Sequence, residues 1–244
     1  MSIRQKQIDA LLRMLNLNEK TTASSGKAVQ AASGSGDVYK VLILDSFTRD
    51  VITPLLRLND LRKAGITLYL LIDSERQNVP DVPAIYFCKP ASDNVKRAVQ
   101  DLATATYDLA HLNFCSPLPD ALMQDLAQGL TKNRCMGRLA KLYDQNLAFV
   151  SLERDLFSLM LPKSYVALND PQAKDAEIEK AIAEIIDHLF CVIATWGSVP
   201  VIRCQRGGAA EHVARALDAY IRKHLDQRQN AFTQNRGSPA SFNR

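Results

Sequence analysis

The sequence predicts an α/β protein built on a five-stranded parallel sheet with helices on both faces. Short apolar runs, such as residues 39–45 and 66–73, lack the polar alternation of a half-exposed strand, so each is expected to be covered on both faces. Amphipathic segments of helical length separate these runs. Because repeated strand–helix–strand units produce parallel strands, we assign residues 38–160 to one such domain.

Each element of this domain has its own signal. The first four predicted strands are Tyr39–Asp45, Ile66–Asp73, Ala84–Cys88 and Tyr107–Phe114. Between the first two strands, Thr53 and Pro54 suit the cap and first turn of a helix, and Gly65 follows its end. A second helix is predicted from Ser92 to Ala105. The residues expected on its inward stripe are Val95, Ala98, Val99 and Leu102.

Residues 1–37 form a separate region in this prediction. Apolar residues at helical spacing, including Leu11 and Leu15, predict an amphipathic helix over Ser2–Leu17. Its polar face carries few charges, so we expect it to dock on the protein's own body rather than on a membrane surface. The stretch Glu19–Asp37 is rich in Ser, Ala, Gly and Thr, a composition typical of flexible linkers.

The segment from Asp120 to Met160 predicts a hairpin of two amphipathic helices. The first stripe consists of Leu122, Met123, Leu126, Ala127 and Leu130. The second consists of Met136, Leu139, Leu142, Tyr143 and Leu147. The polar break TKNR separates helices expected over Ala121–Leu130 and Met136–Leu147, and LAFVSLE then predicts the fifth strand. Two interpretations of these stripes are open. In the first, both stripes face a core; in the second, some of their residues line a groove that is open to a partner's side chain.

After Pro162 the pattern restarts as a second, incomplete α/β domain over residues 161–244. Asp170 and Pro171 suit the start of a long helix ending near Trp196. A strand is predicted over Val199–Cys204 and a helix over Ala209–Asp226, before a polar tail. Two helices and one strand do not close a sheet, so the partner strands must come from elsewhere or the chain is truncated.

Composition excludes several classes of function. The chain has 244 residues, with 47% hydrophobic and 23% charged residues and a net charge of +4. No Lys/Arg stripe with interleaved aromatic residues is present, which argues against nucleic-acid binding. Five widely spaced cysteines without a CxxC motif indicate free thiols in a reducing compartment and neither disulfides nor a metal site. The chain shows no signal peptide or membrane-spanning run, so a cytosolic location is expected.

Catalytic motifs are sparse. Asp45 and Asp73 end strands where parallel sheets bind ligands, so a phosphate-binding or phosphotransfer enzyme is the alternative hypothesis. Phe47 stands where a metal-assisted aspartyl nucleophile would have a second aspartate. Gly207 and Gly208 precede a helix and offer amides to an anion, or form a tight turn. Dinucleotide, P-loop and nucleophile-elbow motifs are missing, so no cofactor is predicted.

Longer runs of the sequence resemble a known family. They are VYKVLILDSFTRDVITPLLRLNDLRKAGITLYLLID, VPDVPAIYFCKP, LAKLYDQNLAFVSLERDLFSL and LFCVIATWGSVPVIRCQRGGAAEHVARALD. They resemble the amino-terminal part of SM (Sec/Munc) proteins, and within that family the Sly branch. The resemblance covers nearly the whole chain in order. It implies that residues 38–160 are SM domain 1 and that the later segment completing domain 2, with the third domain, is absent.

The resemblance also implies the function and its site. SM proteins are not enzymes; in the Sly branch, domain 1 captures the amino-terminal peptide of a Golgi syntaxin-type SNARE and supports vesicle docking and fusion between endoplasmic reticulum and Golgi. Membrane association would be indirect, through SNAREs, on the cytoplasmic side of ER and Golgi membranes. The family's apolar pocket, which takes an aromatic side chain of the peptide, corresponds here to Met123, Leu126, Ala127, Leu139 and Leu142.

Five further residues are expected beside this pocket. Leu130 and Tyr143 would border it, and the charged side chains of Arg138, Lys141 and Asp144 would orient polar residues of the peptide. We expect Leu126→Arg to abolish peptide binding and to leave the domain folded.

Overall fold

The computed structural model describes residues 2–18 and 39–227. The chain divides into two compact units, residues 1–158 and 159–244. The predicted linker over Glu19–Asp37 and the polar tail lie outside the described residues. Within the described part, no helix is long and apolar enough to cross a membrane.

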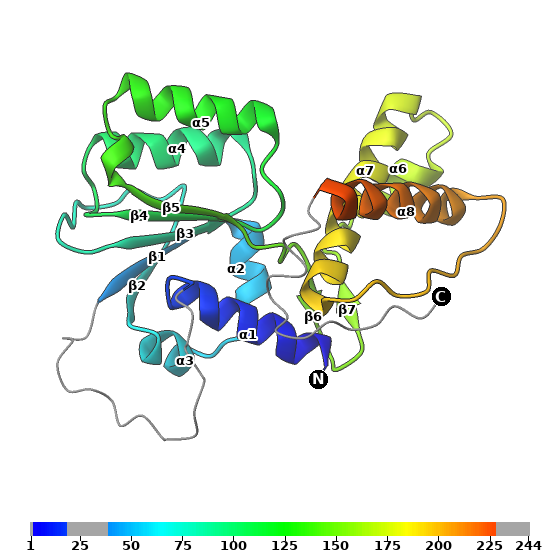
Figure 1. Cartoon of the computed structure of the whole chain (residues 1–244), viewed down its shortest axis with the longest axis horizontal. Coiled ribbons are helices and arrows are strands. Elements are labelled where there is room, and N and C mark those ends of the chain that lie inside the picture. The colour runs from blue at the N-terminus through cyan, green and yellow to red at the C-terminus, as the bar shows by residue number, and fades with distance from the viewer. Residues whose placement is uncertain (1, 19–38, 228–244) are drawn as a thin grey trace. The chain divides into compact units, whose positions relative to one another are not determined.

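A five-stranded sheet forms the centre of the first unit (Figure 1). Its strands are β1 (Lys40–Leu44), β2 (Ile66–Leu71), β3 (Ala84–Cys88), β4 (Ala110–Phe114) and β5 (Leu139–Asp144). The strand order is β2-β1-β3-β4-β5 and every neighbouring pair is parallel. The predicted five-stranded parallel sheet is therefore confirmed.

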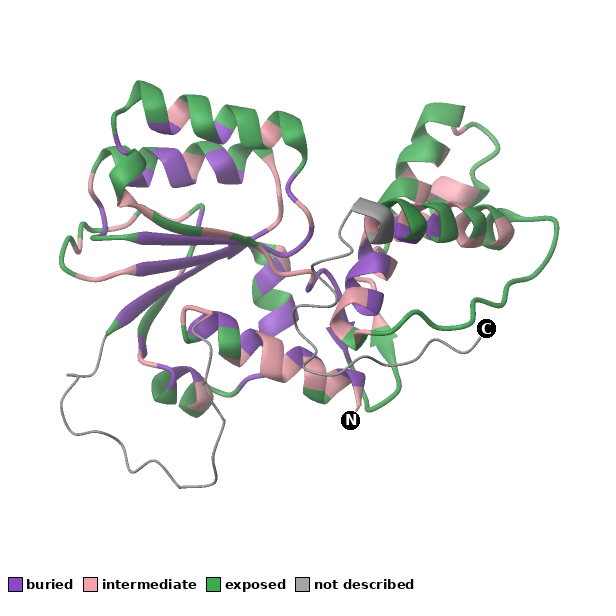
Figure 2. Cartoon of the chain, viewed as in Figure 1, coloured by how far each residue is buried: buried purple, intermediate pink, exposed green. Residues whose placement is uncertain are grey.

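Burial differs between the central and edge strands (Figure 2). Every residue of β1, β3 and β4 is buried, as their continuous apolar runs predict. In β2 only Ile66 is fully buried, and Tyr69 is 57% exposed. The prediction that the second strand is covered on both faces is wrong, because four of its six residues are exposed; within the described residues β2 is also an edge strand of the sheet.

Helices cover both faces of the sheet (Figure 1). On one face lie α4 (Ser92–Ala103) and α5 (Asp120–Lys132); on the other lie α1 (Ile3–Leu15), α2 (Ser46–Ile52) and α3 (Leu58–Lys63). Leu11 and Leu15 of α1 are fully buried, so this helix docks on the protein's own body as predicted. The buried Gln7 side chain fixes it, accepting from the N–H of Ser151 at 2.9 Å and donating to the carbonyl of Phe149.

Two short helices replace the single helix predicted between the first two strands. The Asp45 carboxylate accepts from the N–H and the hydroxyl of Thr48 and so begins α2 directly after β1. Thr53 is the residue that ends α2 rather than the one that begins a helix. The helix predicted over Ser92–Ala105 is present as α4, and its four predicted inward residues are buried.

The second half of the predicted helical hairpin is wrong. After α5, a short 3₁₀ turn over Met136–Arg138 leads directly into strand β5. LAFVSLE is not the fifth strand of the sheet. It contributes β6 (Val150–Ser151), which pairs antiparallel with β7 (Phe157–Ser158).

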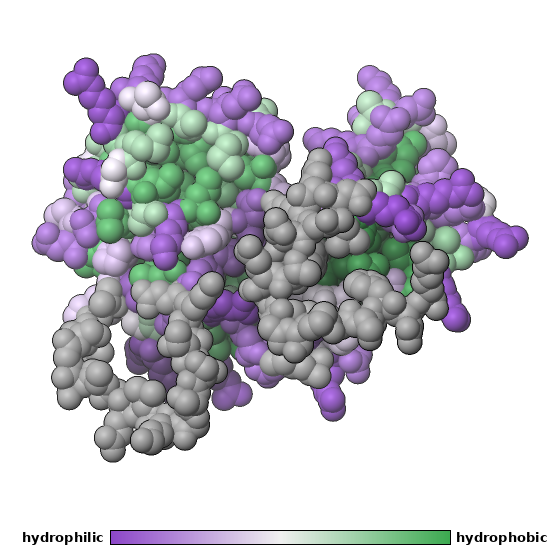
Figure 3. Space-filling model, in the orientation of Figure 1, coloured by the Kyte–Doolittle hydropathy of each residue, from purple (hydrophilic) through white to green (hydrophobic). Residues whose placement is uncertain are grey.

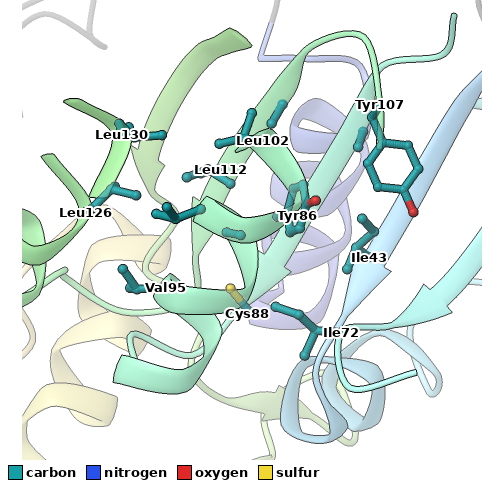
Figure 4. Packing of buried hydrophobic residues seen from close by; sticks show 14 of the residues in the cluster. Ile43, Ile72, Tyr86, Cys88, Val95, Leu102, Tyr107, Leu112, Leu126 and Leu130 are labelled. Atoms are coloured by element: carbon teal, nitrogen blue, oxygen red, sulfur yellow. The ribbon is translucent and has the colours of Figure 1, made fainter. Parts of the chain in front are cut away.

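The hydrophobic core of the first unit lies between the sheet and the helices α4 and α5. Figure 4 shows Leu126 and Leu130 pointing from α5 toward Leu112 of β4, with Val95 and Leu102 of α4 beside them. Leu126 and Leu130 are 2% and 1% exposed. Leu126 and Leu130 of the first predicted stripe are therefore core, and the half-buried Leu122 packs against the same core cluster.

The second unit consists of helices around a smaller core. Its helices are α6 (Ser164–Asn169), α7 (Asp175–Trp196) and α8 (Ala209–Gln227). Ile186, Phe190, Ile193, Leu217 and Ile221 form the buried cluster between α7 and α8. The strand predicted over Val199–Cys204 does not form; Val201 is 85% exposed. A strand needs a hydrogen-bonding neighbour, and the described residues of this unit contain none.

Candidate functional site

Strand β5 contains one extra residue that changes which side chains share a face. Leu139 pairs with Ala110, whereas Lys141 pairs with His111, so Ala140 has no counterpart on β4. This is the arrangement of a β-bulge, in which two residues oppose one. In a regular strand Leu139 and Leu142 would lie on opposite faces because side chains alternate. The bulge places both of them on the face covered by α4 and α5, where they pack against the core.

Helix α5 presents a second set of apolar side chains next to β5. Its buried stripe, Leu126 and Leu130, faces the sheet, while Met123 is 40% exposed and Ala127 is exposed. Figure 3 shows apolar side chains gathered on this face of the unit, where Figure 1 shows α5 and β5. We call the surface formed by Met123, Ala127, Leu139 and Leu142 the α5–β5 patch.

The structure thus separates the five predicted pocket residues into two groups. The patch residues reach the surface, because Leu139 and Leu142 are only half-buried. Leu126 instead lies beneath them in the core. The expectation that Leu126→Arg leaves the domain folded conflicts with this burial, since an unpaired charge in an apolar core is strongly destabilising.

The five predicted bordering residues also separate. Leu130 is core. Arg138 ends the turn before β5, and Asp144 accepts a hydrogen bond from the N–H of Leu118 at 3.1 Å, which joins the end of β5 to the loop before α5. Lys141 and Tyr143 pair with His111 and Asn113 on the opposite face of the sheet.

The opposite face carries a polar environment. His111 is 8% exposed, and its burial lowers the pKa of the imidazole. The cationic side chains of Lys141 and Lys40 lower this pKa further. Asn113 accepts from the Gln145 side chain at 2.7 Å. Lys141 and Tyr143 therefore belong to this polar face and not to the α5–β5 patch.

The aspartates of the alternative hypothesis have different environments. Both oxygens of Asp45 accept hydrogen bonds, one from Thr48 and the other from the N–H of Lys89 at 2.7 Å and the amide of Asn94 at 3.0 Å. Asp45 thus holds the carboxyl ends of β1 and β3 together. Asp73 is exposed. This arrangement gives Asp45 a structural role, because its acceptor sites already have donors.

Other sequence signals also have structural explanations. The N–H of Gly207 donates to Glu211 of its own segment at 2.8 Å, as in a turn leading into α8. All five cysteines fall within the described residues, and none of them forms a disulfide; four are buried. Among residues 2–18 and 39–227, no group of His, Cys, Asp and Glu side chains is arranged to hold a metal ion.

Comparison with protein-family models matches residues 40–242 to the Sec1 family. The chain belongs to the Sec1 family. It is 43% identical over its full length to the SEC1 family transport protein SLY1 of Arabidopsis thaliana, and 42% identical over 95% of its length to a human Sec1 family domain-containing protein 1. It spans 38% and 36% of these two relatives. These relatives confirm the resemblance to the Sly branch.

Solved structures agree with the fold. Sly1p, crystallised in complex with an N-terminal peptide of Sed5p, superimposes with a TM-score of 0.84 and 38% identity. The match covers 93% of this chain and 39% of that one. The Unc18–syntaxin 1 complex of Monosiga brevicollis matches with a TM-score of 0.75 at 23% identity, which supports the fold.

Sequence reasoning did not single out Gly129 or the role of Asp144 in holding Leu118. A glycine in the interior of a predicted helix is a signal that could have identified the first, because it normally has a packing reason. The hydrogen bond of Asp144 joins segments that periodicity does not relate, so no sequence signal identifies it.

Proposed function

We propose that this Sec1-family chain binds the amino-terminal peptide of a syntaxin-type SNARE and has no enzymatic role. Through this contact it supports vesicle docking and fusion in transport between the endoplasmic reticulum and Golgi. The observation that carries the proposal is its similarity, over 93% of its length, to Sly1p in complex with an N-terminal peptide of Sed5p. Its place of action is the cytoplasmic side of ER and Golgi membranes, reached through the SNARE.

The α5–β5 patch is the peptide site in this proposal. Met123 and Ala127 of α5 and Leu139 and Leu142 of β5 present apolar surface to an inserted aromatic side chain, with the buried Leu126 beneath. Removing a phenylalanine side chain from water contributes roughly 1.5–3 kcal/mol. That contribution is large enough to anchor a short peptide, and Met123 is flexible enough to fit its ring.

Charged groups at the ends of the patch orient the peptide. Arg138 stands before β5 and Asp144 at its end, so opposite charges mark the two ends of the strand. Lys141 and Tyr143 take no part, since they lie on the other face of the sheet.

A peptide titration tests the proposal. A fluorescently labelled amino-terminal peptide of a Golgi syntaxin is titrated with the chain, and its anisotropy is followed. We expect saturable binding that weakens when the aromatic residue of the peptide is replaced by alanine. If both peptides bind equally, or neither binds, the proposal is wrong.

A further inference from the structure

Gly129 occupies an unexpected place in helix α5. It lies in the fourth-last position of Asp120–Lys132, inside the helix and not at its end. A glycine at such a position weakens a helix because its backbone loses more freedom on folding than that of any other residue. Its backbone has no positive φ, so alanine would fit the conformation. The reason for glycine must therefore lie in the surroundings.

The surroundings of Gly129 are tight for a side chain. A Cβ atom there would stand 3.0 and 3.1 Å from the two methyl groups of Val99 on α4, and 3.6 Å from its Cβ. Val99 is 8% exposed and belongs to the core cluster, so it has little freedom to move. An added methyl group would therefore displace Val99, or α5 itself, by a few tenths of an ångström.

The distance between α5 and α4 also determines where α5 places its patch residues, Met123 and Ala127. By helical periodicity, Gly129 lies on one flank of the buried stripe of Leu126 and Leu130, and Met123 and Ala127 lie on the other flank. The Gly129 flank faces α4, since it contacts Val99. A helix pushed away from α4 would therefore carry Met123 and Ala127 to new positions over β5.

We propose that Gly129 is a positioning residue for the peptide site. By letting α5 lie against Val99, it sets the distance between the apolar side chains of α5 and those of Leu139 and Leu142 on β5. This inference rests on the proposed function. In this inference a contact between α4 and α5, which lies outside the α5–β5 patch, determines the position of the patch residues on α5.

The variant Gly129→Ala tests this contact. We expect its affinity for the labelled syntaxin peptide to fall by about three- to tenfold, which lies within the range of energetic coupling between residues in contact. The thermal unfolding midpoint should not fall in proportion, because alanine favours the helix. In the matched control Gln128→Ala, at an exposed position of the same helix, affinity should not change.

A second substitution separates positioning from a general structural effect. Val99→Ala makes room for the added methyl group, so Gly129→Ala should leave affinity unchanged in a Val99→Ala background. If Gly129→Ala binds like wild type, or if it weakens binding equally in both backgrounds, the inference is overturned. Failure of the wild-type chain to bind the peptide would instead reject the proposed function, so the two failures are distinguishable.

Discussion

Replacing Met123 by arginine should strongly weaken peptide binding without unfolding the first unit. Met123 is 40% exposed, so an arginine there can keep its charge hydrated at the edge of the α5–β5 patch, and an inserted aromatic ring would have to displace that charge and its water. Losing the roughly 1.5–3 kcal/mol contributed by the buried ring corresponds to about 10- to 150-fold weaker binding. The cost in folding free energy should be about 1 kcal/mol or less, as at other partly exposed positions.

Comparison with Leu126→Arg distinguishes a loss of peptide binding from a loss of folding stability. Leu126 is 2% exposed, so the same charge at that position should destabilise the unit by about 4 kcal/mol or more. Fluorescence anisotropy with the labelled peptide and urea unfolding are measured for both variants, and for Gln124→Arg as an exposed control on α5. Peptide binding by Met123→Arg with wild-type affinity would refute the assignment of the α5–β5 patch.

Three further outcomes follow from the core of the first unit. Leu126→Ala should lower the free energy of unfolding by about 2–5 kcal/mol in urea titrations, and a loss below about 1 kcal/mol would contradict its burial. Asp101→Ala should lower the free energy of unfolding by about 3–5 kcal/mol. The side chain of Arg76 is 2% exposed and lies 2.9 Å from the Asp101 carboxylate, so it would stay buried without this ion-pair partner. Recovery of stability in a double variant with Arg76→Met is the check. Because the folded-state pKa of His111 is lowered, the unfolded state binds a proton that the folded state does not once pH falls below about 6.5, so stability falls there. The drop in urea midpoint from about pH 7.5 to about pH 5.5 should be smaller in His111→Gln, and an equal drop would contradict the assignment.

The central strands could be predicted from the sequence because burial on both faces leaves a plain signal. β1, β3 and β4 are continuous apolar runs, and each is buried along its whole length. β2 has a similar run but is an edge strand, and a run of residues does not show which strands have two neighbours. The order of the strands in the sheet could therefore not be predicted from the pattern of apolar residues.

Strand β5 was mistaken for a helix for a physical reason. Leu139 and Leu142 are three residues apart, a spacing that indicates one face of a helix. The extra residue at Ala140 produces the same spacing on one face of a bulged strand. The family resemblance assigns the same two residues to the predicted pocket, because it depends on their identity and order and not on the secondary structure that holds them.

Other features depend on contacts that are distant in sequence. The stripe of α5 contains both Leu126 and Met123, and only the packing of α5 on the sheet shows that the first is core and the second is surface. The strand predicted over Val199–Cys204 has suitable residues and no neighbouring strand among the described residues of its unit. In both cases the residues suit the predicted element, and contacts with a segment distant in sequence determine whether a side chain is buried or a strand forms.

The central claim is that the α5–β5 patch is the surface that binds the peptide, and methyl NMR tests it most directly. Unlabelled syntaxin amino-terminal peptide is added to the chain carrying ¹³C-labelled Met and Leu methyl groups. We predict shifts at Met123, Leu139 and Leu142, and unchanged signals from Leu44, beside Asp45 at the carboxyl end of β1. Shifts confined to Leu44 and its neighbours, with Met123, Leu139 and Leu142 unmoved, would contradict the account.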